Sequence, residues 1–284
     1  MAIFSNQATL TYNGTTTSSN VAYGELLEVL TATKTAVENG YAPGSTVTYV
    51  VTLRNTGSTP LTGLTVTDDL GGSPFGAGTV YPLEYVADSV RLFADGVPQP
   101  APAAIPGPPL VFTGVSVPAE GDTVLVYQTT ATAFASPAAD GTVTNTVTVT
   151  GDGVTGPVTA SATVDSVAAP ELSITKSITP AQVVDNDRVT YTFVIQNRGN
   201  TPVEATDNGV ITDVFNPVLT DLAVTFEGMT WTQGVQYTYN EATGLFTTEA
   251  GQITVPAATY TQNPVTGEFT VTPGVATLAV TGTI

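Results

Sequence analysis

The stretch Gly44-Ser-Thr-Val-Thr-Tyr-Val-Val-Thr-Leu-Arg-Asn-Thr-Gly-Ser-Thr-Pro60 returns later in the chain as Asn186-Asp-Arg-Val-Thr-Tyr-Thr-Phe-Val-Ile-Gln-Asn-Arg-Gly-Asn-Thr-Pro202. Apolar and polar residues alternate in both, and Val, Thr and Tyr predominate, which is typical of half-buried β-strands. Each strand then runs into the turn signal Asn-x-Gly-x-x-Pro. Downstream, Thr65-Val-Thr-Asp-Asp-Leu70 corresponds to Val210-Ile-Thr-Asp-Val-Phe215. The chain therefore contains one structural repeat twice.

The alternating pattern extends over almost the whole chain, and no segment has a sustained helical period. Strand-like runs are separated by Gly, Asn, Asp and Pro at the spacing of a β-sandwich. The sequence therefore predicts an all-β protein with two tandem Ig-like, Greek-key sandwiches. We expect the first sandwich at residues 29–168 and the second at residues 169–284, preceded by a separate N-terminal hairpin segment at residues 1–28.

The chain contains only two lysines, and they occupy the same position in the two repeats. Lys34 lies in Leu30-Thr-Ala-Thr-Lys-Thr35, and Lys176 lies in Leu172-Ser-Ile-Thr-Lys-Ser177. An ordinary soluble domain carries about a quarter charged residues, with lysines scattered over its surface. Lysine occurs only at these two matched positions, which indicates that its side chain has a chemical role or forms an ion pair there.

The composition excludes several classes of function. The chain has 24 acidic and 6 basic residues and a formal net charge of −18, so its surface repels nucleic acid and anionic lipid. Because it has no histidine and no cysteine, it cannot form a Ser-His-Asp triad, a Cys-His pair or a zinc site of thiolates and imidazoles. No apolar stretch is long enough to span a membrane. An enzyme acting on an external substrate is therefore not expected.

Each repeat has the order lysine, Val-Thr-Tyr, Asn-x-Gly-x-x-Pro and Thr-Asp. This order resembles a repeat family of bacterial surface proteins that is catalogued as domain of unknown function eleven. The resemblance covers most of the chain as two copies. It implies a β-sandwich of extracellular stalks, envelope proteins and fibres, located on a cell or spore surface. Residues 1–20 lack the features of a signal peptide, so a removed leader and an unconventional export route both stay open.

The N-terminal segment resembles the closing hairpin of a repeat. The first repeat closes with Asn145-Thr-Val-Thr-Val-Thr150 and Val158-Thr-Ala-Ser-Ala-Thr-Val164, ahead of the next lysine strand. In the same way, Asn6-Gln-Ala-Thr-Leu-Thr-Tyr12 and Ser19-Asn-Val-Ala-Tyr23 come ahead of the first lysine strand. We therefore expect residues 1–28 to form a hairpin that belongs to neither repeat of its own chain.

The second repeat is expected to lack these closing strands. Its last strand, Thr277-Leu-Ala-Val-Thr-Gly-Thr-Ile284, resembles Thr123-Val-Leu-Val-Tyr-Gln-Thr-Thr130, after which the first repeat continues to its hairpin. A sandwich without closing strands exposes apolar core and an unpaired strand edge, and a lone hairpin is barely stable in water. Docking the hairpin of one subunit into the second sandwich of the next would remove both defects.

Such a contact joins different surfaces head to tail and generates an open homopolymeric filament. The side chains expected to enter the neighbouring sandwich are Ala8, Leu10, Tyr12, Val21 and Tyr23. Two alternatives stay open: a monomeric surface stalk or adhesin-type binding module whose hairpin folds back on its own chain, and a sequence that is one slice of a longer array of repeats.

Both repeats also offer the residues of a Lys–Asn isopeptide bond, similar to those that cross-link the sandwiches of Gram-positive surface fibres. Burial favours a neutral lysine amine, which can attack an asparagine carboxamide while a nearby acid polarises the amide oxygen and carries protons. Ammonia then leaves in a single turnover. The two expected sets are Lys34, Asp68 and Asn145 within one chain, and Lys176 and Asp213 with Asn6 of the next subunit.

Simpler interpretations stay open at this point. The lysines could form ion pairs with the aspartates, with the asparagine merely hydrogen-bonded. Asn20 is a weaker acceptor candidate, because the region of the first repeat that corresponds to it has no asparagine. No cofactor is expected, although Asp185-Asn-Asp187 and Asp207-Asn208 could bind calcium through oxygen ligands. Turn formation explains these two segments more simply.

Overall fold

The computed structural model describes residues 2–284 and is all-β, with one short 3-10 turn, η1 (Ala205–Asp207). The chain is divided into two compact units. One is formed by residues up to 136 and 142–165, and the other by residues 137–141 and 166–284.

Among the described residues, eighteen strands precede the second sandwich. They are β1 (Ala2–Asn6), β2 (Thr9–Tyr12), β3 (Thr15–Ser18), β4 (Ala22–Leu26), β5 (Leu30–Ala36), β6 (Gly40–Tyr41), β7 (Thr46–Asn55), β8 (Leu61–Asp68), β9 (Ser73–Phe75), β10 (Gly78–Val80), β11 (Leu83–Tyr85), β12 (Arg91–Ala94), β13 (Val97–Gln99), β14 (Ala103–Ile105), β15 (Leu110–Val117), β16 (Asp122–Ala131), β17 (Thr142–Thr150) and β18 (Val158–Ser166).

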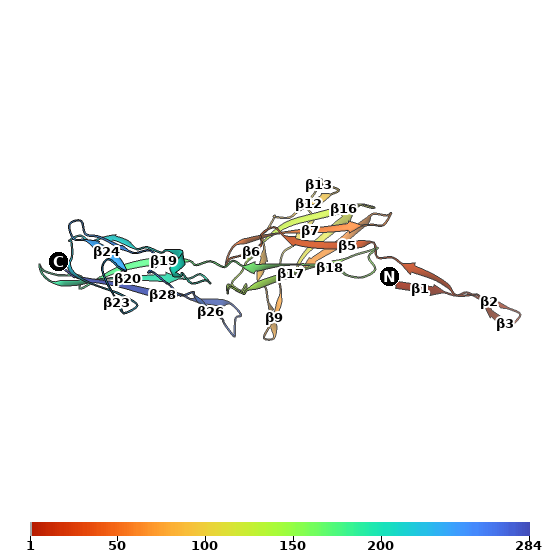
Figure 1. Cartoon of the computed structure of the whole chain (residues 1–284). Helices are drawn as coiled ribbons and strands as arrows, with labels where there is room; N and C mark the ends of the chain where they lie inside the picture. The colour runs from red at the N-terminus through yellow and green to blue at the C-terminus, as the bar shows by residue number, and fades with distance from the viewer. Residues whose placement is uncertain (1) are drawn as a thin grey trace. The chain divides into compact units, whose positions relative to one another are not determined.

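The first unit is a sandwich of two antiparallel six-stranded sheets. One has the order β13-β12-β16-β7-β5, with β11 also paired to β16, and the other has the order β14-β15-β8-β17-β18-β6. Figure 1 shows the long strands β5, β7 and β16 side by side in the first of these sheets. The alternation of β7 accounts for its place, since Val47, Tyr49, Val51 and Leu53 all point inward and are fully buried.

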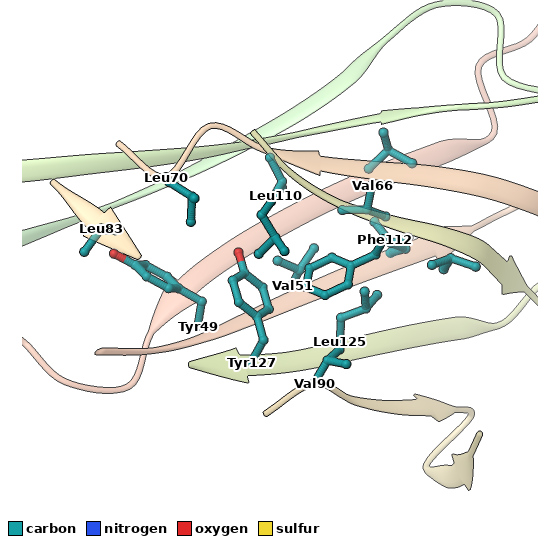
Figure 2. Close-up of a cluster of buried hydrophobic side chains, with 14 of the residues drawn as sticks. Tyr49, Val51, Val66, Leu70, Leu83, Val90, Leu110, Phe112, Leu125 and Tyr127 are labelled. Atoms are coloured by element: carbon teal, nitrogen blue, oxygen red, sulfur yellow. The ribbon is translucent and has the colours of Figure 1, made fainter. Parts of the chain in front are cut away.

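Aromatic side chains fill the space between the two sheets of the first unit. Tyr49 from β7 and Tyr127 from β16 lie with ring centres 5.9 Å apart, and Phe112 from β15 approaches Tyr127 at 5.2 Å. Figure 2 shows the two tyrosine rings with both hydroxyl groups pointing away from their own sheet, toward the opposite one. The core therefore contains two fully buried phenol groups.

The Asn-x-Gly-x-x-Pro signal forms a buried corner in both units. The Asn55 amide donates to the carbonyls of Thr59 and Pro118 and accepts from the Gly57 backbone N–H. Asn197 makes the equivalent bonds, donating to Thr201 and Pro256 and accepting from the backbone N–H groups of Gly199 and Glu171. The repeated motif thus ties the end of a central strand to the loop that follows the facing strand.

Replacing Asn55 by alanine should lower the free energy of unfolding of the first unit by about 3 kcal/mol, because it removes three hydrogen bonds that each contribute about 1 kcal/mol. Chemical denaturation followed by tyrosine fluorescence measures the change. Asn20→Ala is the matched control, since Asn20 is exposed and no bond of its side chain holds the fold. Equal denaturation midpoints for the two variants would contradict the role given to the corner.

The second unit has a similar plan with fewer strands. These are β19 (Leu172–Thr179), β20 (Arg188–Asn197), β21 (Thr212–Val214), β22 (Thr220–Phe226), β23 (Met229–Trp231), β24 (Tyr237–Asn240), β25 (Leu245–Thr248), β26 (Thr259–Gln262), β27 (Phe269–Thr272) and β28 (Gly274–Thr283). One sheet has the order β19-β20-β28-β22-β23, and a three-stranded sheet of order β21-β25-β24 faces it across a shared core.

The three-stranded sheet of the second unit corresponds to β8-β15-β14 of the first. In the first unit β8 continues the sheet by pairing with β17, which pairs with β18. Within the described residues, β21 pairs with β25 alone, and its other edge is open. The second sandwich, as described, therefore lacks the equivalents of two strands that complete the first.

The N-terminal segment forms a long hairpin. β1 pairs with β4 and β2 with β3, and the described strands of the hairpin pair only with one another. Figure 1 shows it as a narrow two-stranded ribbon. Every residue from Ile3 to Tyr23 is exposed, including Phe4, Leu10 and Tyr12. A lone two-stranded hairpin of this kind, with its apolar side chains exposed, has little to stabilise it by itself.

Candidate cross-linking sites

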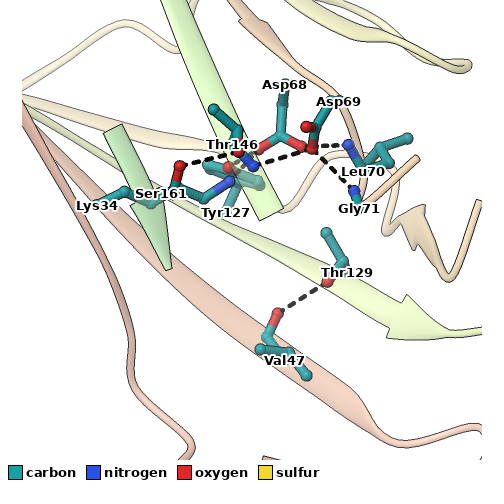
Figure 3. Close-up of polar contacts among 10 residues, drawn as sticks. All are labelled: Lys34, Val47, Asp68, Asp69, Leu70, Gly71, Tyr127, Thr129, Thr146 and Ser161. Atoms are coloured by element: carbon teal, nitrogen blue, oxygen red, sulfur yellow. Dashed lines mark hydrogen bonds and ion pairs between the residues drawn. The ribbon is translucent and has the colours of Figure 1, made fainter. Parts of the chain in front are cut away.

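Lys34 and Asp68 form an ion pair in the core of the first unit. The Lys34 Nζ lies 2.7 Å from the Asp68 Oδ2, and both side chains are fully buried. Lys34 comes from β5 in one sheet and Asp68 from the end of β8 in the other, so the pair bridges the sandwich. Asp68 also accepts from the Leu70 backbone N–H and from the Tyr127 hydroxyl (Figure 3).

Asn145 lies on the inner face of the neighbouring strand β17. The carboxylate of Asp69 accepts from the Thr146 backbone N–H at 2.9 Å, and Val147 pairs with Asp68, which together fix β17 beside β8. The Asn145 side chain is completely buried, yet neither its Nδ2 nor its Oδ1 has a hydrogen-bond partner. Leaving a buried amide unpaired costs about 1–3 kcal/mol for each group, so this arrangement calls for a chemical explanation.

The surroundings of Lys34 favour the neutral amine. Burial lowers the pKa of Lys34 below its usual range, although attraction to Asp68 and the hydrogen bond between them oppose the change. The Nζ also lies 4.6 Å from the ring centre of Tyr49. A lysine with a lowered pKa, facing a carboxylate and packed beside β17, has the properties of an amine nucleophile.

Lys176 and Asp213 form the corresponding ion pair of the second unit. The Lys176 Nζ lies 4.5 Å from the ring centre of Tyr191 and 5.2 Å from that of Phe215. Unlike the first pair, this one faces solvent: the side chains of Lys176 and Asp213 are 38% and 19% exposed. The two centres thus have the same charged residues but differ in how far water reaches them.

The exposure of Lys176 belongs to a larger opening in the second unit. Leu172, at the start of β19, is 50% exposed, whereas Leu30 at the same position of β5 is 5% exposed. A groove of about 200 Å³ lies between β19 and the segment that leads into β21. Its apolar lining is formed by Leu172, Ile174, Ile195, Val203, Val210, Ile211 and Ile253.

The N-terminal hairpin matches the β17–β18 hairpin in the pairing of its asparagine. Asn6 lies opposite Ala22, as Asn145 lies opposite Ala162. Counting from Asn6 along the first strand, Ala8 and Leu10 correspond to the fully buried Val147 and Val149. In this chain, Asn6 therefore occupies the hairpin position that Asn145 occupies in the complete sandwich.

The pairing divides the expected donor side chains between two faces. Ala8, Leu10 and Tyr12 alternate on the face of Asn6. Tyr23 pairs with Ser5 and so lies on the opposite face, because Asn6 pairs with Ala22. Val21 precedes β4, where the register shifts by one residue between the β1–β4 and β2–β3 pairs. Asn20 lies in the same irregular segment and is exposed.

The two aspartate-rich segments form turns in the structure. The Asp187 carboxylate accepts from the Val184 backbone N–H, and Asn186 has a positive φ of 70°. Asp207 accepts from the Glu204 backbone N–H at the start of η1, and Asn208 ends that turn with a φ of 55°. Over residues 2–284, no three acidic side chains gather into a group that could hold a metal ion.

Sequence reasoning missed the tyrosines that surround the first ion pair. Tyr127 donates to Asp68, and the fully buried Tyr49 hydroxyl has no hydrogen-bond partner. The available signal was the inward position of both residues in alternating strands opposite one another, Tyr49 facing Tyr127 in the β7–β16 ladder.

No family model matches the chain, and no curated protein matches it, so the family resemblance of the repeats stays a prediction. Solved structures that resemble it include the pilus backbone RrgB from Streptococcus pneumoniae (12% identity, TM-score 0.34, 86% of this chain and 55% of that one). A second is the major pilin SpaD from Corynebacterium diphtheriae (13% identity, TM-score 0.37, 85% of this chain and 58% of that one). A third is a C-terminal fragment of the major pilin GBS80 of Streptococcus agalactiae (10% identity, TM-score 0.35, 86% of this chain and 91% of that one). The chain thus spans little more than half the length of RrgB and SpaD. At such low scores these likenesses do not bear on the chemistry of the sites.

None of the described segments forms a helix with the length and hydropathy needed to cross a membrane.

Proposed function

We propose that this chain is the structural subunit of an extracellular filament that assembles head to tail. The N-terminal hairpin of one copy docks into the open second sandwich of the next and supplies the two strands that the described part of this sandwich lacks. The observation that supports this best is the pair of matched defects, a hairpin with exposed apolar side chains and an exposed apolar groove. β-augmentation satisfies the backbone groups of both edges at once.

The first unit supplies the register of the docked hairpin. There, Val147 pairs with Asp68 and Val149 with Val66. Carried over to the junction, Ala8 of the hairpin pairs with Asp213 of the neighbour, and Leu10 pairs with Ile211. Leu10 then fills the groove beside Val210 and Leu172, and Asn6 reaches the position beside Lys176 that Asn145 has beside Lys34.

Isopeptide bonds then make both sandwiches permanent. Lys34 bonds to Asn145 within the chain, and Lys176 bonds to Asn6 of the next subunit, with Asp68 and Asp213 as the acids. Docking buries Lys176 and removes water from it, which favours the neutral amine that attacks the carboxamide. Filaments of this type need no disulfide, consistent with the absence of cysteine.

Assembly can be tested with two neighbouring residues of the hairpin. Leu10→Asp places a charge on the face that enters the groove, and we expect it to leave the purified protein monomeric. Thr11→Asp places the same charge on the opposite face and should still form filaments, since Thr11 and Thr16 face away from Leu10. Light scattering after size-exclusion chromatography and negative-stain microscopy give the readout.

Two results would contradict the proposal. A wild-type protein that stays monomeric would favour the alternative, a monomeric surface stalk or binding module. Equal assembly of the Leu10→Asp and Thr11→Asp variants would show that this face of the hairpin does not enter the neighbouring sandwich.

A further inference from the structure

We infer that Tyr49, and Tyr191 at the second centre, are catalytic residues that donate a hydrogen bond to the asparagine oxygen during isopeptide formation. This inference rests on the proposed cross-linking function and deepens it. It divides the chemistry between two residues: the aspartate carries the proton, and the tyrosine hydroxyl stabilises the charge that develops on the amide oxygen.

The buried atoms without partners carry the argument. Over the described residues, three buried side-chain nitrogen or oxygen atoms have no hydrogen bond: the Tyr49 hydroxyl, the Asn145 Nδ2 and the Asn145 Oδ1. Tyr49 lies beside the Lys34 amine, and Asn145 lies on β17, the strand paired with the β8 strand that carries Asp68. All three atoms therefore belong to the surroundings of one ion pair. Native proteins leave few buried polar atoms unpaired, so their concentration at one place indicates a reactive site.

The position of Tyr49 suits a donor to this amide. Its ring lies under the Lys34 Nζ at 4.6 Å, and its hydroxyl points toward the sheet that carries Asn145 (Figure 2). Burial and the negative charge of Asp68 raise the pKa of Tyr49, so the hydroxyl keeps its proton, while the nearby Asn145 amide lowers the pKa to a lesser extent. The two side chains are therefore neighbours, although no hydrogen bond of normal geometry joins them.

The reaction balances with the groups present. The neutral Lys34 Nζ attacks the Asn145 Cγ, a C–N bond forms, and the Oδ1 becomes an oxyanion that accepts from the Tyr49 hydroxyl. Asp68 takes a proton from the Nζ and gives it to the Nδ2, which leaves as ammonia when the second C–N bond breaks. In the product, the Asn145 Nδ2 has left as ammonia, and the Asn145 Oδ1 accepts a hydrogen bond from the Tyr49 hydroxyl. None of the three atoms then stays buried without a partner.

Comparison of the two centres singles out Tyr49 rather than Tyr127. Tyr191 occupies the position of Tyr49 in the second repeat, with the Lys176 Nζ 4.5 Å from its ring centre. Tyr127 has no such counterpart: it pairs with Tyr49, whereas Tyr191 pairs with Val280. If one reaction operates at both centres, the hydroxyl common to both is that of Tyr49 and Tyr191.

The test follows the mass of freshly synthesised protein over time, from the unreacted chain to the chain that has lost one ammonia. Tyr49→Phe should slow the intrachain loss by about 10²- to 10³-fold, the usual effect of removing one oxyanion donor. Tyr127→Phe is the matched control: it removes the other buried phenol, which donates to Asp68 rather than to the amide, and we expect it to slow the reaction less than Tyr49→Phe does. Near-ultraviolet circular dichroism confirms that each variant is folded.

Tyr49→Phe reacting at the wild-type rate, or Tyr127→Phe slowing the reaction as much, would overturn the assignment. A wild-type chain that never loses ammonia would instead refute the cross-linking function itself. Should Tyr49→Phe fail to fold, Tyr191→Phe decides the question at the junction, where the rate at which boiled multimers accumulate must fall by a similar factor. An unchanged rate there would overturn the inference as well.

Discussion

Lys176→Met should reduce a boiled ladder of multimers to a single monomer band on a denaturing gel, while each monomer still lacks one ammonia. In the proposed filament each junction carries one covalent bond between Lys176 and Asn6 of the next subunit, which would give rise to the ladder. Methionine keeps a long side chain to fill the aromatic surroundings formed by Tyr191 and Phe215 but has no amine. Intact mass spectrometry of each band gives the number of ammonia molecules lost.

Two hairpin variants serve as matched partners to this experiment. Asn6→Ala should remove the ladder as completely as Lys176→Met, since it removes the other half of the bond. Asn20→Ala should leave the ladder intact, because Asn20 lies in the irregular segment of the second hairpin strand. A ladder that survives Asn6→Ala but disappears with Asn20→Ala would reassign the acceptor. A wild-type sample with only monomers of unreacted mass would exclude isopeptide formation.

Asn145→Leu should strongly destabilise the first unit, and the direction of the change distinguishes two interpretations. If Asn145 were merely buried beside an ion pair, replacing its unpaired amide by an apolar group of similar shape would be neutral or stabilising. If it is bonded to Lys34, the substitution opens a covalent loop of roughly 110 residues, which by the chain-entropy model for cross-links costs about 4–5 kcal/mol.

Chemical denaturation of the full chain measures this change, with the unfolding of the first unit followed through its buried tyrosines. Thr129→Val is the control, because Thr129 is equally buried but donates only one bond, to the Val47 carbonyl, and should cost about 1 kcal/mol. A denaturation midpoint of Asn145→Leu at or above that of the wild type would favour the plain ion pair between Lys34 and Asp68.

The sequence predicted the strands with strict alternation, and the structure confirms the all-β class. In β7, each second residue is apolar, so the inward face of Tyr49 and Val51 follows from the period of two alone. The Asn-x-Gly-x-x-Pro motif predicts a turn at Asn55. The hydrogen bond from Asn55 to the Pro118 carbonyl, however, depends on a loop far away in the chain. Such bonds are set by how the sheets meet, which a local pattern does not contain.

Register was the main source of error. The expected match of Thr277 with Thr123 is wrong by one residue: Thr123 pairs with Leu53, and the position equivalent to Leu53 pairs with Ala276. A shift of one residue exchanges the two faces of a strand, which concealed the fact that Val280 replaces Tyr127 at the second centre. In the hairpin, the pairing of Tyr23 with Ser5 puts Tyr23 on the face opposite Asn6.

Because one chain carries both the hairpin and the open groove, polymer chemistry describes how long the proposed filaments become. A molecule with two complementary reactive ends is an AB monomer, and once irreversible bonding has gone to completion, the mean length of its polymer is limited by the fraction of monomers that lack one end. In the proposed filament, a copy without residues 1–28 would keep its groove and accept a hairpin but could not donate one, so it would act as a chain stopper. Mixing such copies with the intact protein should shorten the filaments, with a mean length that varies inversely with the fraction added.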